Sequence, residues 1–144
     1  MAAAARLSFE AGHRVTSVRT VTDADVRDFA RLSGDTQGFH VEEEYARQTR
    51  FGRRVAHGTL AVGFVSAALG TQLASSHESV LLISGDLKLP GPMYVGDTIT
   101  TALEVIKVNH RRRWAILTAL CTNQDGKPVL RGEVTVMVDP FPYH

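Results

Sequence analysis

The stretch from Gly58 to Leu73 is apolar on every side, and this feature restricts the possible fold more than any other. Leucine, valine, phenylalanine and alanine are spread around the helix that it would form, so no polar stripe remains. A helix of this kind is stable only when it is buried. A membrane span needs roughly 20 apolar residues, and Gly, Ser, Thr and Gln interrupt this shorter run. The stretch therefore predicts a buried central helix, with Gly63, Ala67 and Gly70 forming a thin side against a sheet.

Four strand-like segments follow the apolar stretch and could cover it. They are Val80–Leu89, Thr98–Val108, Trp114–Thr122 and Val129–Val138. Proline and glycine at positions 90–92 end the first segment, and Asp125-Gly126 is typical of a hairpin turn between the last two. The third segment is apolar on both faces, as in a central strand whose two faces are both covered. We expect an α+β fold in which one long buried apolar helix is wrapped by a curved, mostly antiparallel β-sheet.

The first half of the chain is predicted to be mainly helical. A short strand over Arg14–Val21 precedes Thr22-Asp23-Ala24-Asp25, which fits a capping box. The helix that this box begins ends at Ser33-Gly34, and its apolar stripe consists of Val26, Phe29, Ala30 and Leu32. A shorter helical turn over Glu42–Gln48 follows, with acidic residues at its positive end. Residues 1–13 are expected to be an N-terminal tail, and residues 14–140 the single domain.

Composition excludes several classes of function. The 144 residues suffice for one domain with a real core, and a net charge of +1 gives no electrostatic case for nucleic acid or for a membrane surface. The lone Cys121 excludes a disulfide framework and a cysteine-based zinc site. The histidines at positions 13, 77, 110 and 144 lack ligand spacing, so we expect no metal. The Ala-rich N-terminus is too weakly apolar for a secretory signal, which predicts a cytoplasmic protein or, alternatively, one of the mitochondrial matrix.

Asp35 and His40 are the strongest candidates for catalysis. They stand five residues apart in a turn-prone segment between two helical patterns, and His57-Gly58 then opens the apolar helix. A carboxylate and an imidazole beside a helix N-terminus with free backbone N–H groups are what the addition of water to a polarised double bond requires. A glycine at the start of the helix lets a carbonyl oxygen approach the backbone closely, so the Gly58 N–H is the expected oxyanion donor.

Longer motifs in the chain match a known family. They are Phe29-Ala30-x-Leu32-Ser33-Gly34-Asp35, His40, Tyr45-Ala46, Phe51-Gly52, Val55-x-His57-Gly58-x-Leu60 and Gly96-Asp97. Together they resemble the MaoC-like, (R)-specific enoyl-CoA hydratases or 3-hydroxyacyl-thioester dehydratases, which have the hotdog fold. The signature of that family typically reads Gly-Asp-x-Asn-Pro-x-His, with a small residue six positions beyond the histidine. Gly34, Asp35, His40 and Ala46 agree with it, whereas Gln37 and Gly38 replace Asn and Pro.

The resemblance implies a role for each residue of the site. Asp35 and His40 would hold a water molecule and act as base and acid, in an order that stays open. His57 would shape the turn before the central helix, and it is assigned with Gln37 to the substrate-binding part of the site. Ser66 would lie near the Asp35 carboxylate; the alternative is a helix serine that bonds its own i−4 carbonyl. Leu69 would line the acyl pocket, with plain core packing as its alternative.

Basic residues near the site suggest how the substrate is carried. Arg54 and its neighbours Arg47, Arg50 and Arg53 are expected to meet the phosphates of coenzyme A or an acidic acyl-carrier protein. A second basic cluster, residues 107–113, is expected to be a solvated hairpin tip. The resemblance implies a homodimer that interconverts trans-2-enoyl and (3R)-3-hydroxyacyl thioesters in fatty-acid metabolism, without a metal or redox cofactor. The alternatives are a carrier-protein dehydratase of fatty-acid synthesis and a non-catalytic acyl-thioester binder.

Overall fold

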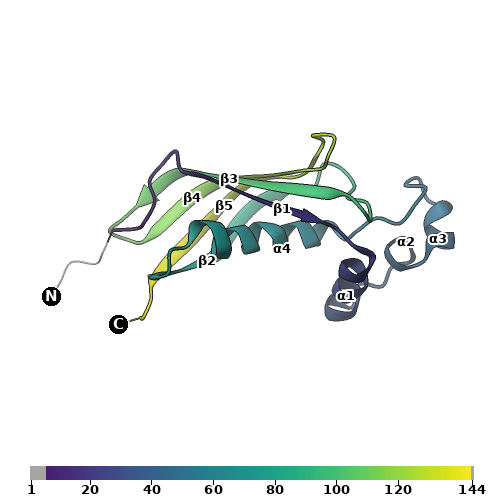
Figure 1. Cartoon of the computed structure of the whole chain (residues 1–144), viewed down its shortest axis with the longest axis horizontal. Helices are drawn as coiled ribbons and strands as arrows, with labels where there is room; N and C mark the ends of the chain where they lie inside the picture. The colour runs from purple at the N-terminus through teal and green to yellow at the C-terminus, as the bar shows by residue number, and fades with distance from the viewer. Residues whose placement is uncertain (1–5, 144) are drawn as a thin grey trace.

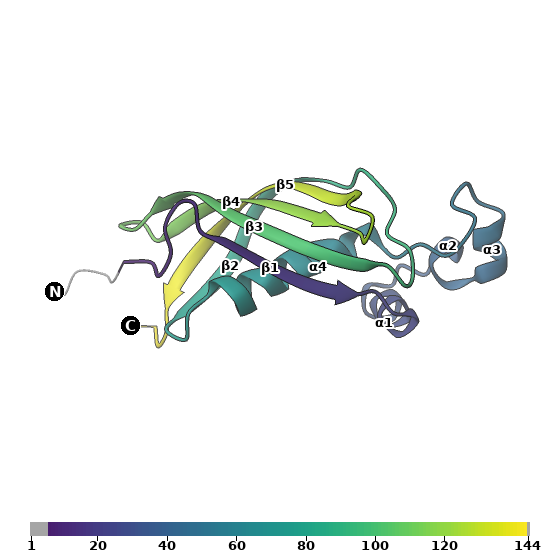
Figure 2. The same ribbon diagram turned by 45° about the horizontal axis from the view of Figure 1, so that its top comes forward.

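The helix predicted to be central, α4 (Gly58–Ala68), lies along one face of a five-stranded antiparallel sheet. Figure 1 shows the helix beneath the sheet, and Figure 2 shows the strands crossing over it. The computed structural model describes residues 6–143. One π-helical turn, η1 (Leu69–Leu73), extends α4. The strands are β1 (Arg14–Thr20), β2 (Glu78–Lys88), β3 (Thr98–Asn109), β4 (Trp114–Thr122) and β5 (Pro128–Pro140), in the sheet order β1-β3-β4-β5-β2. This arrangement confirms the expected α+β class.

Alternation of apolar residues along the strands explains why the sheet packs on α4. Successive side chains of a strand point to opposite faces, so every second residue can enter the core. In β3 this places Ile99, Leu103 and Val105 on the helix side, where each is only 1% exposed. The other strands contribute Leu117, Leu130, Val134, Val136 and Val138 to the same core. The sequence pattern therefore predicts the inner face of the sheet correctly.

The thin side of α4 does not face the sheet, and this part of the sequence prediction is wrong. Gly63, Ala67 and Gly70 are exposed, and the positions where side chains of the two glycines would stand are open. The helix instead buries its bulkier face, because more apolar surface leaves water that way.

The outer face of β4 was also expected to be covered, yet Leu120 is 42% exposed. Among residues 6–143, no helix combines the length and the apolar character that crossing a membrane would demand.

The helices before α4 gather at one end of the sheet, beside the N-terminus of α4 (Figure 1). They are α1 (Asp23–Ser33), α2 (Gly38–Val41) and α3 (Glu43–Arg47). The predicted capping box of Thr22 and Asp25 begins α1, and Gly34 ends it in the left-handed conformation, at a φ of 80°. Leu32 does not join the buried stripe, because it is 74% exposed. The sequence predicted α1 and α3, whereas it gave no signal for α2, which carries His40.

Residues 6–13 pack at the opposite end of the sheet. Leu7 and Phe9 are 4% and 3% exposed and belong to the core. The Gly12 N–H donates to the Val105 carbonyl at 2.7 Å, which aligns this segment with β3. Residues 1–5 of the expected tail lie outside the described residues.

Candidate active site

Asp35 follows directly from the end of α1. Its backbone N–H donates to Ser33 Oγ at 3.1 Å, and its Oδ1 accepts from the backbone N–H and the side-chain amide of Gln37, at 3.3 and 3.1 Å. These bonds form an Asx-type turn that holds the carboxylate in place. The Gln37 amide is the main reason that the pKa of Asp35 lies below its ordinary value, because it stabilises the ionised form. Gln37, one of the two departures from the family signature, therefore supports the carboxylate directly.

His40 is presented by α2 and is only 5% exposed. Its Nδ1 lies 2.7 Å from the backbone carbonyl oxygen of Val55. A carbonyl can only accept, so the neutral ring carries its hydrogen on Nδ1 and keeps a lone pair on Nε2. Burial lowers the pKa of His40 below its ordinary value of 6.5, because the charged imidazolium loses hydration there. His40 is thus held as a neutral ring whose Nε2 is available as a proton acceptor.

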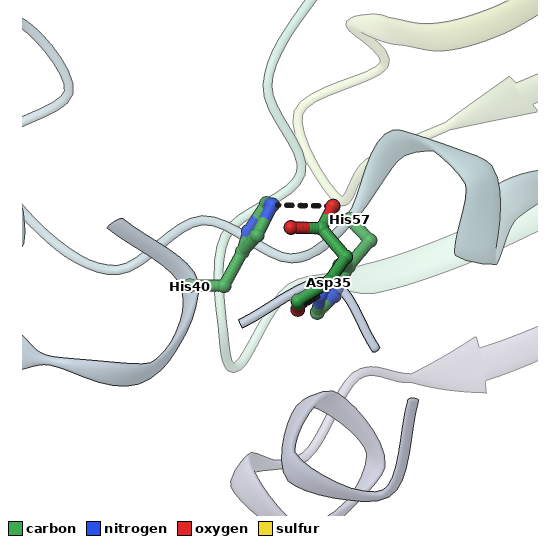
Figure 3. Close-up of side chains that lie close together, drawn as sticks. All are labelled: Asp35, His40 and His57. Carbon is green, nitrogen blue, oxygen red and sulfur yellow. Dashed lines mark hydrogen bonds and ion pairs between the residues drawn. The ribbon is translucent and has the colours of Figure 1, made fainter. Parts of the chain in front are cut away.

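The two side chains face each other across a short gap (Figure 3). Nε2 of His40 lies 3.6 Å from Oδ2 of Asp35. This distance exceeds that of a direct hydrogen bond, but both atoms are acceptors and a single water molecule could donate one hydrogen to each. The arrangement can therefore orient a water molecule and remove a proton from it.

His57 lies beneath this pair. Its Nε2 is 2.8 Å from the Asp35 carbonyl oxygen, and its ring stacks on that of His40 with the centroids 3.8 Å apart and the planes at 23°. The sequence indicated that His57 shapes the turn before α4, but it gave no signal for the stack, because the two histidines are distant in sequence and meet only when α2 and α4 come together.

Gly58 and His40 line one pocket of about 350 Å³. Apolar side chains form most of its remaining wall, namely Phe39, Phe51, Leu89 and Met93, and Arg50 lies at its edge. Gly58 is the first residue of α4, so its N–H has no partner within the helix. A larger groove of about 600 Å³ crosses the outer side of β2 and β5. We assign the site to the smaller pocket because it alone of the two contains the histidine and a helix N-terminus.

The wall formed by residues 89–93 was not foreseen. The sequence identified Pro90-Gly91-Pro92 only as the end of a strand, yet this segment crosses in front of the α4 N-terminus. A side-chain carbon added to Gly58 would stand 2.7 Å from Cδ1 of Leu89, which shows how closely this wall approaches. No local sequence pattern predicts this contact between Gly58 and Leu89, which are far apart in the chain. It depends on the position of β2 in the sheet.

The other three predicted site residues, Arg54, Ser66 and Leu69, differ in their surroundings. Arg54 is 9% exposed, and its guanidinium turns inward: Nε donates to the His40 carbonyl at 2.7 Å and Nη1 pairs with Asp23 of α1. In this position it ties α1 to α2. Ser66 stands on the exposed side of α4. Leu69 is 1% exposed and packs in the hydrophobic core.

Asp35, His40 and His57 also form the one group with the composition of a metal site within the described residues, their ligand atoms lying within 4.8 Å of one another. Zinc bonds of about 2.0–2.2 Å would bring all ligand atoms within roughly 4.4 Å of one another. Lone pairs of stacked imidazoles lie in nearly parallel planes, so they point past a common centre. The residues present do not fit a metal ion without rearrangement.

A central helix wrapped by an antiparallel sheet, with a carboxylate–imidazole pair beside the N-terminus of that helix, is typical of a hotdog-fold protein of the dehydratase kind. The chain belongs to the MaoC-like dehydratase family: the MaoC-like domain matches residues 8–122. An (R)-specific enoyl-CoA hydratase of Rhodospirillum rubrum is 38% identical over 127 residues, which cover 88% of this chain and 86% of that protein. A hydratase of the same name from Aeromonas caviae is 33% identical over 129 residues, covering 90% and 95% of the two chains.

Solved structures agree with this assignment. The (R)-hydratase from A. caviae that is involved in PHA biosynthesis superposes with a TM-score of 0.84 at 30% identity, covering 90% of this chain and 97% of the other. The unliganded R-hydratase PhaJ1 of Pseudomonas aeruginosa gives a TM-score of 0.83 at 29% identity, over 90% and 81% of the two chains.

Proposed function

We propose that this protein is an (R)-specific enoyl-CoA hydratase, a hydro-lyase that adds water reversibly to trans-2-enoyl thioesters and yields (3R)-3-hydroxyacyl thioesters in fatty-acid metabolism. The observation that carries this proposal is the 3.6 Å gap between the His40 and Asp35 side chains, beside a pocket that His40 and Gly58 line. The names of the relatives support it: besides the two (R)-specific hydratases, a 3-hydroxybutyryl-CoA dehydratase of Methylorubrum extorquens is 36% identical over 120 residues.

The chemistry follows from the two acceptors. A water molecule donates to Asp35 Oδ2 and His40 Nε2, and its oxygen attacks Cβ of the enoyl thioester. The proton that it loses is taken up by the pair, and a proton from the pair is delivered to Cα, so that one water is added in total. During the attack negative charge develops on the thioester oxygen. The Gly58 N–H at the start of α4 stabilises this charge, with the positive end of the helix dipole behind it.

The pocket and its rim suit an acyl thioester on a phosphate-bearing carrier. Aromatic and aliphatic side chains form the inner wall, which favours the acyl chain. Arg50 is exposed and lines the pocket, where it can meet phosphate groups. Arg47 pairs with Glu44, and Arg53 lies over the ring of Tyr94. On the sequence alone, Arg54 was assigned to the same phosphate-binding role. Its side chain is buried, and it supports the site by donating to the His40 carbonyl.

Loss of the ultraviolet absorbance of a conjugated enoyl thioester tests this function. With crotonyl-CoA and with a longer trans-2-enoyl-CoA, the purified protein should remove the absorbance and form the (3R)-3-hydroxyacyl product, identified by chiral chromatography. A (3S) product, or no turnover of either substrate by the folded protein, would contradict the proposal.

Carrier-protein thioesters are the alternative substrates. A mitochondrial 3-hydroxyacyl-[acyl-carrier-protein] dehydratase of Solanum lycopersicum is 26% identical over 130 residues. If the protein served fatty-acid synthesis in this way, crotonyl-carrier protein would be turned over with a higher kcat/KM than crotonyl-CoA. A non-catalytic binder would take up enoyl-CoA without any change in absorbance.

The pH dependence of hydration should follow His40. The reaction starts from neutral His40 and ionised Asp35, and the pKa values of both groups are lowered. On acidification from neutral pH, His40 protonates before Asp35, and its Nε2 can then no longer accept. We expect kcat/KM to be constant down to the ordinary histidine value of 6.5 and to fall only below it. An acid limb centred above that value would contradict the buried, neutral state of His40.

We further propose that two copies associate through β2 and the open side of α4. β2 is an edge strand of 11 residues with Leu81 and Ile83 exposed by 45% and 53%, and long apolar edges invite strand pairing. The uncovered, small-residue side of α4 lets a second copy approach, and Ser66 would then lie near the interface.

Sedimentation should find a dimer for the unmodified chain and a weakened dimer for Ile83→Lys. Leu120→Lys changes a similarly exposed residue of central β4 and should leave the dimer intact; equal effects would contradict pairing through β2.

A further inference from the structure

His57 contacts Asp35 and His40 and directly precedes Gly58, the three residues proposed to act in catalysis. Its Nε2–H donates to the Asp35 carbonyl at 2.8 Å, its ring lies 3.8 Å from that of His40, and its backbone is the N-cap of α4, directly before Gly58. Phe29 of α1 closes the other side of the ring, with the centroids 4.7 Å apart. Because His57 is only 1% exposed, it is locked between α1 and α2 and has no access to solvent.

Packing alone does not explain a histidine at this place. Nδ1 of His57 is buried and has no hydrogen-bond partner among residues 6–143. Since Nε2 donates to a carbonyl, the neutral ring leaves Nδ1 as an unsatisfied acceptor, which destabilises a fold. A phenylalanine would fill the same space without this cost. The imidazole is therefore explained by what its N–H and its flat ring do for the neighbouring groups.

We propose that His57 is a positioning residue of the hydratase site, which fixes Asp35 relative to His40 and to the Gly58 N–H without touching the substrate. The bond to the Asp35 carbonyl holds the backbone of the residue whose carboxylate must face His40. The stack sets the plane of the His40 ring, while the bond to Val55 sets the rotation within that plane. This inference rests on the proposed function, because positioning has meaning only for a dyad that acts on water.

The stacked His57 ring also shields one face of the His40 ring from water. The charged or titratable groups around His40 are the Asp35 carboxylate, His57 itself, Arg54 at the His40 carbonyl, and Arg50 at the pocket edge. Burial is the largest influence that disfavours a charged His40, and the nearby His57 acts in the same direction. Replacing the ring by a smaller amide would admit water to the face of His40 and make its protonation easier.

Two variants separate the functions of the imidazole. His57→Phe keeps a ring to stack and fills the space but loses the N–H that holds Asp35. His57→Gln keeps an N–H donor and loses the stack. We expect each to lower kcat for crotonyl-CoA by about 10²-fold, the effect of a small misplacement of catalytic groups, while KM stays within about threefold. The acid limb of the pH profile should also move up toward 6.5, and further in His57→Gln, which admits water to His40, than in His57→Phe, which keeps the face of its ring covered.

His110→Phe is the matched control. His110 is a half-buried histidine with two ring hydrogen bonds, at the β3–β4 turn and therefore at the other end of the sheet. It should keep the kcat of the unmodified protein even if its thermal stability falls. If both His57 variants fold, as judged by circular dichroism, and retain kcat within about threefold, the positioning role is wrong.

NMR of the His40 ring tests the inference without turnover. In the unmodified protein we expect the Nδ1–H tautomer, which the Val55 carbonyl sets, and a ring-current shift of the His40 carbon-bound protons. In His57→Gln the tautomer should persist, while the chemical shifts of the His40 ring should be altered. An unchanged His40 spectrum in that folded variant would overturn the positioning role even if the unmodified enzyme is active. An unmodified protein that fails to hydrate enoyl-CoA but shows the expected spectra would instead overturn the proposed function.

Discussion

Hydration of crotonyl-CoA should fall by about 10²–10⁴-fold in kcat when Asp35 is replaced by Asn or His40 by Ala, the usual contribution of general acid–base catalysis. Asp35→Asn keeps the shape of the side chain but removes the charge, and its amide can donate to His40 Nε2, which would block the lone pair that should receive the proton from water. His40→Ala removes the Nε2 acceptor, so that Asp35 alone remains to accept a hydrogen from the water molecule. Both effects are expected in kcat, because neither group is needed to bind the acyl chain.

The position of Asp35 makes its variant easy to interpret. Its side chain is 37% exposed and lies in a turn, so the substitution should leave the fold intact. His77→Ala, which changes an exposed histidine in the loop before β2, is a control for His40→Ala. The double variant should be hardly slower than either single variant, because two groups that act on one water do not contribute additively. Turnover within about threefold of the unmodified protein in Asp35→Asn would show that this pair is not the catalytic one.

The Gly58 N–H can be removed without breaking the helix that presents it. Gly58 is the first residue of α4, where proline is well tolerated, and the preceding His57 has the extended backbone, ψ 127°, that proline requires of its neighbour. Gly58→Pro deletes the N–H, whereas Gly58→Ala keeps it. Both add a carbon that would press on the flexible end of Leu89 in a similar way. The difference between the two variants therefore measures the N–H alone.

We expect kcat of Gly58→Pro to be about 10²–10³-fold below that of Gly58→Ala, which corresponds to the loss of one oxyanion donor. Measurements at saturating crotonyl-CoA separate this effect from the crowding at Leu89, which should appear mainly in KM. Equal kcat values for the two variants, with unchanged helical circular dichroism, would mean that another group stabilises the thioester oxygen.

Much of the fold could be read from local patterns. Apolar alternation in β3 identifies its buried face, because the geometry of a strand turns every second side chain to the same side. The capping box at Thr22 and the left-handed Gly34 fix the ends of α1, since both satisfy backbone groups within a few residues. The Asp35–His40 pair was also predicted, because both residues agree with the signature of the family that the longer motifs resemble.

Contacts between distant segments were outside the reach of these patterns. The sequence wrongly turned the thin side of α4 toward the sheet, because an all-round apolar helix carries no signal that distinguishes its faces. It also gave no reason to expect that Arg54 would turn inward to Asp23 and the His40 carbonyl.

The sequence by itself determined most elements of this protein and the core side of its sheet, because these depend on periodicity and on neighbours along the chain. Its resemblance to the family signature singled out the two residues proposed to act on water. Only the tertiary structure decided which groups support them. The His57 imidazole reaches the Asp35 carbonyl 22 residues away, and the His40 ring reaches the Val55 carbonyl 15 residues away. Such bonds form because α1, α2 and the start of α4 are brought together by the packing of the whole sheet on one helix, and no short stretch of sequence encodes that packing.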